Sequence, residues 1–480
     1  MSTINTNIPS LVAARVLHAN SNRLSTSLER LSTGYRINSG KDDPAGLIAS
    51  EGIRSDKIAI QAAIGNAQAA DKVVSVAEGA LNEVNALLLE LESLVDRSAN
   101  TAALSDEEIQ ANQLQVDAIL SSIDRIASTT QFKGKQLLDG SLDYNTTGVS
   151  SSDLTSVNIT SARLVGGTTR TVAVQVTSAA ETGQLFHGPG AASLGAAATI
   201  RVTGEFGSDT VSLVDGTSLT DVAAAINSSR DLTGVSATVT GAGASSQLVF
   251  SSTNYGRNSF VTVEAISGTM ATTNADSQTV DTDFGLDVTA TVNGVEAVTN
   301  GRNVSVRSTT LSADLILSED LATANGTTST SFTILGGGAN FSLSPVIGLA
   351  GMESLGIKSV ASSSLGNSEV GILATLRSGG VNDLDGSDLS NAQRIVRAAS
   401  EEVSTLRGRL GAFQKNTIQP TVNSLQITLE NTSAAESAIR DTDFASETAE
   451  LTRAQILVST ATATLQLANN APASVLQLLG

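Results

Sequence analysis

The sequence predicts an α+β protein, in which a discontinuous, coiled-coil-like bundle of N- and C-terminal helices carries an inserted, mostly antiparallel β region. Two patterns predict this fold class. Near both ends of the chain, apolar residues recur at intervals of three and four, the spacing of a helix that buries one narrow stripe. In the middle, short runs of alternating β-branched residues are separated by Asn-Gly and Asp-Gly pairs, which are typical of antiparallel hairpins.

The composition disfavours several classes of function. The 480-residue chain has 28 Lys and Arg against 47 Asp and Glu, a formal net charge of -19, so binding to nucleic acid or anionic membranes is not expected. Cys is absent, which excludes disulfides and thiolate metal sites. The chain has no run of about 18 apolar residues, and residues 1–10 lack a signal-peptide pattern, so neither membrane insertion nor a cleaved signal peptide is expected.

The first helix is expected over residues 8–31, and Gly34 should stop it. Its apolar row consists of Leu17, Leu24 and Leu31, with Leu28 between them. Residues 35–43 are rich in charged and small residues and predict a loop.

The longest helix is expected from Pro44 to Arg97, with Asp43 as its N-cap acceptor. Its apolar seam repeats every seven residues and consists of Ile60, Ala67, Val74, Leu81, Leu88 and Val95. A third helix should follow the capping box of Ser105 and Glu108 and run antiparallel to the second, because the connection is short. Its stripe contains Ile109, Val116 and Ile123.

From about residue 144 to residue 385 the chain is rich in Gly, Ser, Thr, Val and Asp. Runs with a period of two predict strands at residues 170–176, 199–203, 236–240, 248–251 and 260–264. One helix, at residues 218–226, interrupts them.

Helical spacing returns with a capping box of Ser390 and Gln393, and the next apolar row includes Leu406, Leu410 and Phe413. Pro420 should kink or break this helix. A last helix, capped by Ser433 and Glu436, should carry Leu451, Val458 and Leu465 and end at Pro472. Because each helical end has one stripe and few local partners, the two ends should pack on each other, and the rows of the second and third helices and of residues 406–413 should form a seam within one protomer.

Two long runs carry a family resemblance. Residues 30–47 read RLSTGYRINSGKDDPAGL, and residues 439–457 read IRDTDFASETAELTRAQIL. With them the chain closely resembles bacterial flagellin over roughly residues 1–140 and 390–480. Residues 218–227 with 252–256 are similar to an insert repeat seen in many flagellins.

This resemblance implies a non-enzymatic structural subunit, without cofactors, that polymerises into the extracellular bacterial flagellar filament used for motility. It implies an inner-tube domain (residues 1–43 with 446–480), a helical rod domain (44–145 with 385–445) and a variable, surface-exposed insertion (146–384). It also implies export through the flagellar type III apparatus with an export chaperone, and contacts with filament cap and hook-junction proteins.

The ends of the chain lack enough surrounding sequence to bury their stripes, so neighbouring copies should cover them. An open helical array joins different surfaces of successive subunits. The candidate filament interface comprises the apolar residues Leu17, Leu24, Leu28, Leu31, Leu451, Val458 and Leu465, and the charged residues Arg36, Asp42, Asp43, Arg440, Asp443 and Arg453. For the charged residues, ion pairs within a single protomer are an equally good alternative.

No catalytic or metal-binding constellation is evident. Five residues separate Gly34 from Gly40 where a P-loop needs four, and Asp42 stands where a hydroxyl should bind Mg²⁺. The histidines, His18 and His187, lie in unrelated contexts and no His-Glu-x-x-His is present. Asp43 is better explained as a helix cap than as half of a catalytic carboxylate pair.

The resemblance has one marked departure. Where many flagellins have a basic patch read by the innate Toll-like flagellin receptor, residues 89–94 read LELESL. Glu90 and Glu92 stand in place of arginines, so the charge-assisted bonds of such a receptor should be lost and its activation should be weak or absent.

Two alternative functions stay open at this stage. One is a hook-filament junction protein of the same superfamily. The other is an adhesin or glycan-binding role for the insertion, which calls for an aromatic platform or metal-binding carboxylates that Tyr255 and Phe260 alone do not supply.

Overall fold

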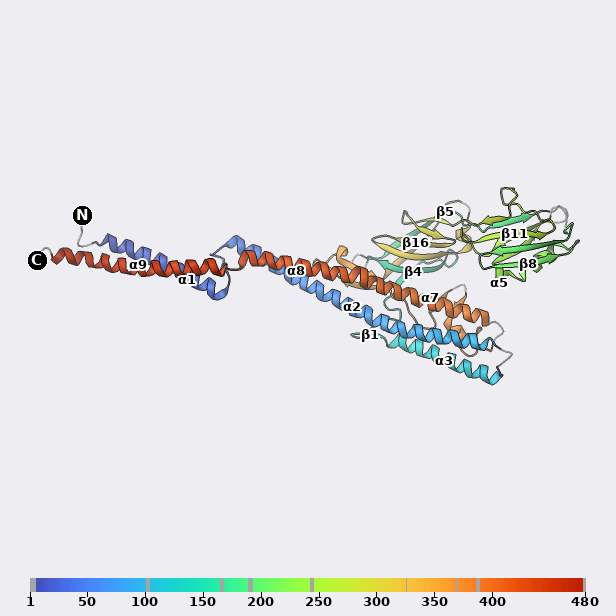
Figure 1. Cartoon of the computed structure of the whole chain (residues 1–480), viewed down its shortest axis with the longest axis horizontal. Coiled ribbons are helices and arrows are strands. Elements are labelled where there is room, and N and C mark those ends of the chain that lie inside the picture. Colours follow the sequence, from blue (N-terminus) through green and yellow to red (C-terminus); the bar gives the residue numbers. More distant parts are fainter. Residues whose placement is uncertain are drawn as a thin grey trace. The chain divides into compact units, whose positions relative to one another are not determined.

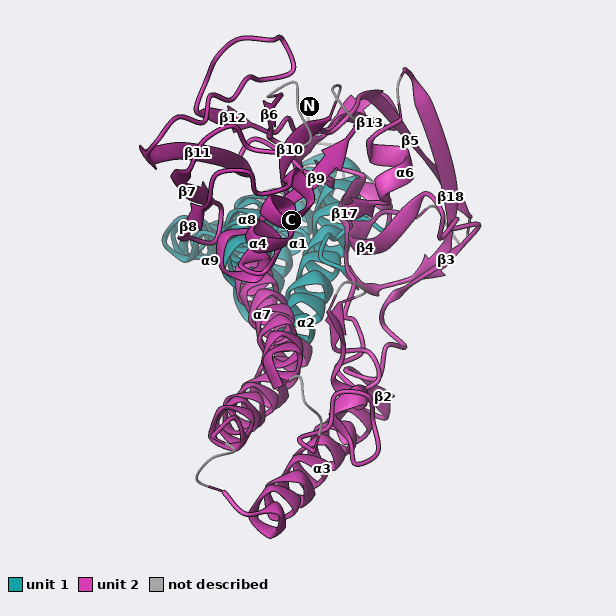
Figure 2. Cartoon of the chain, turned by 90° about the vertical axis from the view of Figure 1, so that its right-hand side faces the viewer, with its two compact units in different colours: residues 1–70, 342–347, 415–480 teal, residues 71–341, 348–414 magenta. Residues whose placement is uncertain are grey.

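The computed structural model describes residues 6–100, 104–164, 168–188, 193–241, 246–324, 326–367, 370–385 and 389–477 (Figure 1). The chain divides into two compact units, which Figure 2 distinguishes by colour. Unit 1 comprises residues 1–70, 342–347 and 415–480, and unit 2 comprises residues 71–341 and 348–414. Of the predicted inner-tube domain, residues 1–5 and 478–480 lie outside the described part of the chain.

Unit 1 is helical. It contains α1 (Ile8–Thr33), the first part of α2 (Pro44–Ser98), α8 (Gln419–Arg440) and α9 (Phe444–Gln477). The side chain of Asn7 caps α1 by accepting from the Ser10 N–H at 3.1 Å. Gly34 ends α1 in the left-handed region, at φ 76°, where glycine has no Cβ to strain, and this confirms the predicted stop.

Helices α1 and α9 lie side by side and run antiparallel (Figure 1). The Asn7 amide donates to the Ala468 carbonyl at 2.8 Å near one end of the pair. Near the other end, Arg30 and Glu447 form an ion pair at 3.6 Å. Residue numbers therefore rise along one helix as they fall along the other.

Helices α2 and α8 are also antiparallel within unit 1. The Lys57 ammonium meets Glu436 at 2.9 Å, and the Arg440 guanidinium meets Glu51 at 3.1 Å. Further along the same two helices, a small core is formed by Ile60, Ala63 and Ile64 of α2 with Leu425 and Leu429 of α8.

Three predictions about the C-terminal helices were wrong. Ser433 and Glu436 do not cap the last helix, because both lie inside α8, where Glu436 binds Lys57; α9 begins instead after Asp443. Ser390 lies inside α7 (Leu389–Phe413), and Gln393 donates to Asp96 rather than to a cap. Helix α9 continues through Pro472 to Gln477, because flanking alanines favour a helix strongly enough to tolerate one missing N–H.

The helical part of unit 2 contains the second half of α2, α3 (Asp106–Thr129) and α7. The predicted capping box of α3 is present, with the Glu108 N–H on Ser105 Oγ and the Ser105 N–H on Glu108 Oε2. Arg397 reaches Glu92 at 2.9 Å, and Gln393 reaches Asp96 at 2.6 Å, so α7 runs antiparallel to α2. The predicted break at Pro420 takes the form of a π-helical turn over Gln414–Ile418, just before α8.

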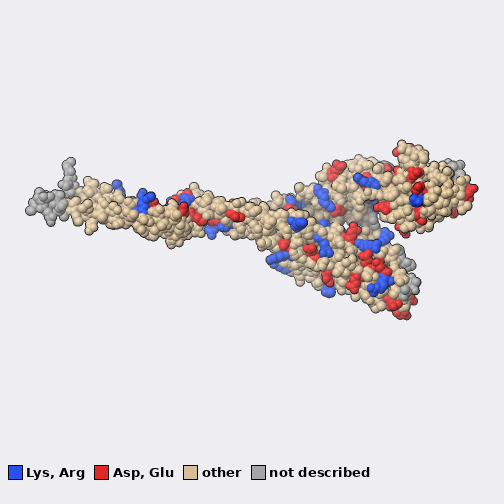
Figure 3. All heavy atoms as spheres, viewed as in Figure 1, with Lys and Arg blue, Asp and Glu red and all other residues tan. Residues whose placement is uncertain are grey.

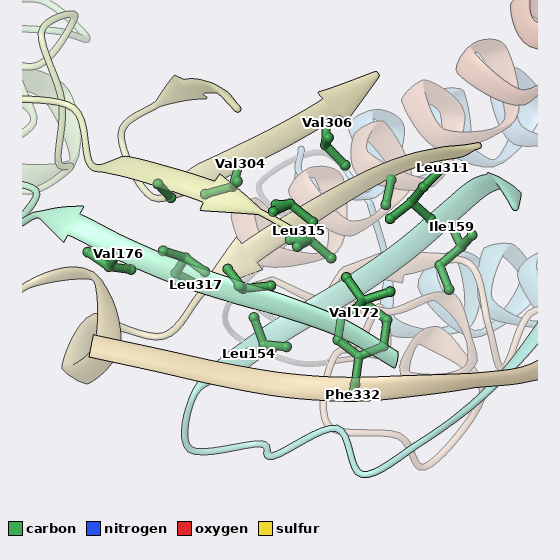
Figure 4. Close-up of a cluster of buried hydrophobic side chains, with 14 of the residues drawn as sticks. Leu154, Ile159, Val172, Val176, Val304, Val306, Leu311, Leu315, Leu317 and Phe332 are labelled. Carbon is green, nitrogen blue, oxygen red and sulfur yellow. The ribbon is translucent and has the colours of Figure 1, made fainter. Parts of the chain in front are cut away.

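The rest of unit 2 is mostly β. Lobe A, which we define as residues 144–178 with 287–342, forms two antiparallel sheets in the strand orders β14-β13-β5-β18-β3 and β15-β16-β17-β4. Its elements are β3 (Tyr144–Thr147), β4 (Leu154–Ala162), β5 (Arg170–Ser178), β13 (Thr289–Val292), β14 (Val295–Glu296), β15 (Val298–Asn300), β16 (Asn303–Arg307), β17 (Leu311–Leu317), α6 (Glu319–Ala322) and β18 (Thr328–Gly337). Figure 4 shows its core, where Phe332 and alternate residues of β5 and β17 face one another.

Lobe B, residues 181–286, is nested between β5 and β13 of lobe A. It has the sheets β6-β10-β9 and β12-β11-β7-β8. Its elements are β6 (Gln184–His187), β7 (Ala198–Gly204), β8 (Ser208–Leu213), α4 (Leu219–Asn227), α5 (Arg230–Thr233), β9 (Val235–Thr240), β10 (Gln247–Ser252), β11 (Phe260–Ser267) and β12 (Thr282–Phe284). Phe250 is fully buried in its core beside α4.

Short elements complete unit 2 and its border. They are β1 (Gln131–Phe132), β2 (Lys135–Gln136), β19 (Ala339–Ser342), the 3₁₀ turn Leu349–Gly351, β20 (Met352–Leu355), β21 (Gly366–Asn367), β22 (Gly371–Ile372) and the 3₁₀ turn Leu373–Leu376. The strand registers described are antiparallel, and the strands lie between N- and C-terminal helices, so the predicted fold class is confirmed. Among the helices of the described part, none combines the length and apolar character needed to span a bilayer.

Candidate self-assembly surface

The α1/α9 pair has an unusually small seam. Its buried residues are Ala13, Asn20 and Ser27 from α1, and Ala454 and Ala461 from α9, each set spaced by seven. Small side chains let two helices approach closely, but they remove little apolar area from water. The pair therefore gains little stability from its own interface.

Large apolar side chains of the same pair remain in solvent. Leu11 is 66% exposed on α1, and Leu467 is 73% exposed on α9. The other exposed members are Ile8, Val12, Val16, Leu28, Phe444 and Ile456. On the face that Figure 3 shows, charged residues are also sparse along these two helices. An apolar surface that extends along two helices is typical of a surface that another protein covers.

Part of this surface is a groove of about 550 Å³ between α1 and α9. It is lined by Ile8, Pro9, Val12, Ala13, Val16, Asn20, Leu457, Thr460, Ala461 and Thr464. The groove lies beside the alanine seam, because alanines cannot fill the space between the two helices.

The predicted apolar interface residues divide into two sets. Leu28 is half exposed to solvent. The remaining six, Leu17, Leu24, Leu31, Leu451, Val458 and Leu465, are half-buried along the α1/α9 pair. The more exposed residues Ile8, Leu11 and Leu467 were not among the predicted interface residues, since they fall outside the rows that repeat every seven positions.

The two breaks between helices pair with each other. The Arg36 N–H donates to the Arg440 carbonyl at 2.7 Å, and the Thr442 N–H donates to the Gly34 carbonyl at 2.9 Å. The Arg440 guanidinium lies over the Tyr35 ring, 4.8 Å from its centroid. These contacts join the α1/α2 loop to the α8/α9 junction, and no periodic pattern in the sequence could have indicated them.

The charged candidates have partners inside the chain. Arg36 Nη2 donates to the Ile439 carbonyl at 2.6 Å, and Arg453 meets Glu450 at 2.8 Å. Asp43 caps α2 through the Gly46 N–H at 2.9 Å, and Asp443 accepts from the Ala445 N–H at 2.9 Å. This geometry favours the alternative that the sequence left open, contacts within one protomer.

Asp42 organises the loop before α2. Its carboxylate accepts from the hydroxyl and N–H of Ser39, at 2.9 and 2.8 Å, and from the Asn38 N–H at 3.2 Å. These hydrogen bonds, first of all those from Ser39, lower the pKa of Asp42. The loop is thus a turn built around a carboxylate.

The predicted seam residues are mostly buried. Ten of them are buried: Ile60, Ala67, Val74, Leu81, Leu88, Val95, Val116, Ile123, Leu406 and Leu410. Ile109 is half-buried, and so is Phe413, whose ring lies 5.7 Å from that of Phe341. The seam thus extends to the inserted region, through an aromatic contact that heptad spacing does not predict.

The histidines are not brought together. His18 is exposed on α1, whereas His187 Nδ1 lies 2.7 Å from the Ala271 carbonyl in lobe B. Within the residues that the structure describes, no three His, Cys, Asp or Glu side chains gather as metal ligands.

Family models match three parts of the chain. Residues 4–143 match the bacterial flagellin N-terminal helical region, and residues 394–479 match the bacterial flagellin C-terminal helical region. Residues 199–254, which include α4, match the flagellin hook IN motif.

Relatives match over the whole length. B-type flagellin from Pseudomonas aeruginosa is 31% identical and flagellin from Salmonella rubislaw is 28% identical, each over 99% of this chain and 99% of the relative. Among solved structures, FliC from Burkholderia pseudomallei aligns with 72% of this chain and 99% of its own, at 14% identity and a TM-score of 0.23. That TM-score is too low to support a conclusion.

Proposed function

Because this chain belongs to the bacterial flagellin family, it is a structural subunit of the flagellar filament, and we propose that the exposed apolar face of α1 and α9 is its main assembly surface. One observation carries the proposal. The α1/α9 pair buries alanine, asparagine and serine while Leu11 and Leu467 stay in solvent. Fully burying one Leu or Ile side chain stabilises a contact by about 1.5–3 kcal/mol, so neighbouring copies that cover this face stabilise the array.

The filament contact is heterologous. An open helical array forms when one surface of a subunit meets a different surface of the next and the rotation does not close. The groove beside the alanine seam and the exposed leucines on the same pair provide two such different surfaces. On this proposal, the predicted apolar residues take part in the filament contact: Leu17, Leu24, Leu28, Leu31, Leu451, Val458 and Leu465.

For the charged candidates we propose a supporting role. Five of them hold the junction between the helix pairs in shape, through the contacts described above: Arg36, Asp42, Asp43, Arg440 and Asp443. Arg453 instead pairs with Glu450 within α9 and supports that helix. Their effect on assembly is then indirect, because they orient α1 and α9. Charge reversal at Arg36 should change filament yield or shape.

The domain assignment follows the same reasoning. We propose that residues 1–43 with 446–480 form the inner tube, where apolar helices are shielded most fully. Residues 44–145 with 385–445 form the rod, and residues 146–384 face outward. The self-contained cores of lobes A and B support an outward position, since they need no neighbour to be covered.

The protein belongs to the bacterial flagellum, and we propose an extracellular location, reached through the flagellar export apparatus with an export chaperone. Filament cap and hook-junction proteins are the further proposed partners. Family membership supports these assignments. The flagellin family is structural, and we propose that this chain likewise has no enzymatic activity and needs no cofactor.

The basis for weak receptor activation is local. Glu92 is engaged by Arg397 at 2.9 Å, and Glu90, two residues earlier in α2, is exposed. A receptor that requires arginines here would meet two carboxylates. A reporter-cell assay should show little response, and a strong response would overturn this proposal.

A matched pair of substitutions tests the assembly surface. Val16 is 45% exposed beside the groove, and Val214 is 73% exposed in lobe B. Val16→Glu places a charge on the proposed interface, so the critical concentration for elongation onto filament seeds should rise at least about tenfold, the equivalent of 1.4 kcal/mol. Val214→Glu makes the same chemical change and should leave elongation unchanged.

Light scattering and electron microscopy would measure elongation, and circular dichroism would check that both monomers fold alike. Normal elongation of Val16→Glu would contradict the proposal. So would an equal loss in both variants, because it would point to a general effect of added charge.

A further inference from the structure

The two β lobes of unit 2 meet at a cross-linked waist. Where the chain passes from lobe A to lobe B and back, Glu181 and Leu286 exchange two backbone hydrogen bonds, each 2.9 Å. The Asp287 carboxylate, whose side chain is 7% exposed, accepts from the Gly301 N–H at 2.8 Å and from the Arg257 N–H at 3.1 Å. A loop of lobe B is thereby held against a turn of lobe A.

Gly256 allows this close approach. Its φ is 105°, and a Cβ there would lie 2.5 Å from Asp287 Oδ1 and 2.6 Å from the Gly301 backbone. Any other residue would push the loop away from the turn. The waist is therefore a close-packed contact between the lobes, and the space beside it has a defined shape.

A polar cleft lies beside the waist. We call it the interlobe cleft; its volume is about 700 Å³, within the range of about 300–1,000 Å³ that is usual for small-molecule sites. Its walls include Glu205, Arg230 and Asn254 from lobe B, and Asn300, Asn303 and Glu319 from lobe A. Neither the assembly surface nor the helical seam uses it.

The lining is rich in side-chain amides. Five asparagines contribute: Asn254, Asn258, Asn300, Asn303 and Asn367. An amide offers both donors and an acceptor, whereas a guanidinium only donates and a carboxylate only accepts. Such a lining suits a ligand whose own groups also donate and accept, as sugar hydroxyls do.

The charges of the cleft exclude other ligand classes. Two cations, Arg230 and Arg302, are balanced by two carboxylates, Glu205 and Glu319, so no net field attracts a phosphate or another strong anion. An apolar ligand would leave the amides and hydroxyls without water or partners, at a cost of about 1–3 kcal/mol for each buried group. An uncharged, hydroxyl-rich ligand has neither problem.

Several of these groups are already held in place. Glu205 accepts from the Asn254 amide at 3.0 Å and from the Ser259 hydroxyl at 2.9 Å. The Asn258 amide donates to Asn300 Oδ1 at 3.1 Å. Because fewer side chains must be ordered on binding, a ligand loses less free energy to their immobilisation.

Tyr255 gives the cleft one aromatic wall. Its hydroxyl donates to Glu319 Oε1 at 2.6 Å, and Arg302 lies 5.7 Å from its ring centroid. A ring held in this way can contact the C–H groups of a sugar. Within the described chain, the Arg230 guanidinium and the Asn303 amide have no hydrogen-bonding protein partner, so both are free to meet ligand hydroxyls.

We propose that the interlobe cleft binds an uncharged oligosaccharide. The polar atoms of Asn303 and Arg230 bond its hydroxyls, and the asparagines tied to the waist bond others. This role is separate from filament assembly, because the residues concerned lie in lobes A and B and not on α1 or α9.

The proposal can be tested on the full-length monomer by saturation-transfer-difference NMR and calorimetry. The probes are the uncharged trisaccharides triacetylchitotriose, maltotriose and mannotriose, with inorganic phosphate and sialyllactose as charged counterparts. We expect saturable binding of at least one uncharged probe and none of the charged ones. Asn303→Ala and Arg230→Ala should each weaken that binding about fivefold, the effect of one lost hydrogen bond.

Asn145→Ala is the matched control. Asn145 is an exposed asparagine of β3, in lobe A but outside the cleft, and among the described residues its side chain has no hydrogen-bonding partner. Its replacement should leave binding unchanged. The proposal is overturned if no uncharged probe binds at millimolar concentration, if phosphate binds instead, or if the cleft variants bind as tightly as the control. Elongation of the same variants onto seeds is expected to be normal, so failure of this site does not depend on the assembly proposal.

Discussion

The α1/α9 pair and the β lobes solve the problem of burying apolar surface in opposite ways. The helix pair encloses Ala13, Ala454 and Ala461 and leaves leucines in solvent. Each lobe instead encloses a phenylalanine completely, Phe332 in lobe A and Phe250 in lobe B, among valines and leucines from facing sheets. The lobes can be stable alone, whereas the helix pair depends on what covers it.

This contrast shows where function resides in the chain. A region whose own core is thin stays responsive to its neighbours, because new contacts change its free energy by an amount comparable to its total stability. A region with a full core gains little from a neighbour. We therefore propose that assembly depends on the termini and recognition of other molecules on the insertion.

The largest expected effect comes from removing one partner of the thin pair. A chain without residues 451–480 should not elongate onto filament seeds at all, because α1 then has no helix beside it. Deleting residues 184–283 removes most of lobe B, yet it should leave elongation normal. That deletion can be closed by a short turn, because the flanking residues Glu181 and Leu286 exchange two backbone hydrogen bonds of 2.9 Å. The contrast between regions breaks down if both deletions abolish growth.

A core substitution should affect the lobes strongly. Phe332→Ala leaves a cavity in lobe A and should lower the free energy of unfolding by about 3–5 kcal/mol. Phe284, which is 60% exposed in lobe B, provides the control, and Phe284→Ala should cost less than about 1 kcal/mol. Urea unfolding followed by circular dichroism would compare them, and similar losses would argue against a close-packed lobe.

Asp287 makes the waist sensitive to acid. Burial raises the pKa of this carboxyl, but hydrogen bonds from Gly301 and Arg257 outweigh burial, and its pKa is lowered overall. A lowered folded-state pKa means that the stabilisation is complete above the unfolded value, about pH 4, and is lost as the pH falls through the folded value. Asp287→Asn should lower the free energy of unfolding by about 2 kcal/mol at neutral pH. That free energy should then change less as the pH falls below about 4.

The control for this pH profile is Asp276→Asn, because Asp276 is an exposed carboxylate of lobe B. Its unfolding free energy should follow that of the unchanged protein at each pH. If the free energy of unfolding of Asp287→Asn fell with decreasing pH as steeply as that of the control, the waist would not depend on this carboxylate.

The smallest expected effect concerns a helix end in unit 2. Ser105→Ala removes the hydroxyl that accepts from the Glu108 N–H. It should lower the free energy of unfolding by about 1 kcal/mol. Ser121→Ala changes an exposed serine inside the same helix and should be neutral or slightly stabilising, because alanine favours helices. Thermal unfolding of the two variants would separate capping from general helix propensity.

Much of the fold was predictable because it depends on local spacing. Heptad rows predicted α1, α2, α3 and the buried seam, and period-two runs predicted strands such as β5 and β7. The capping box of Ser105 with Glu108 was also predicted correctly. The capping signature of Ser433 and Glu436 misled, because Lys57, far away in the sequence, binds Glu436 instead.

The candidate site was only partly predictable. Periodicity selected Leu17, Leu24 and Leu31, which lie half-buried between α1 and α9, and it missed the more exposed Leu11 and Leu467. The charged candidates remain a prediction, and several of them, such as Arg36 and Arg440, lie at the junction between the helix pairs. Their intrachain partners, such as Ile439 for Arg36, could not be read from spacing.

By itself, the sequence determined where most helices and strands lie, which stripes are apolar, and that both ends of the chain are helical. Those properties follow from hydrogen bonds and side-chain positions within a few residues of each other. The tertiary structure alone decided which stripe stays exposed, how the two helix breaks pair, and that Asn254 and Asn303 face one cleft. Each of these depends on residues distant in sequence meeting in space, and local patterning carries no information about such meetings.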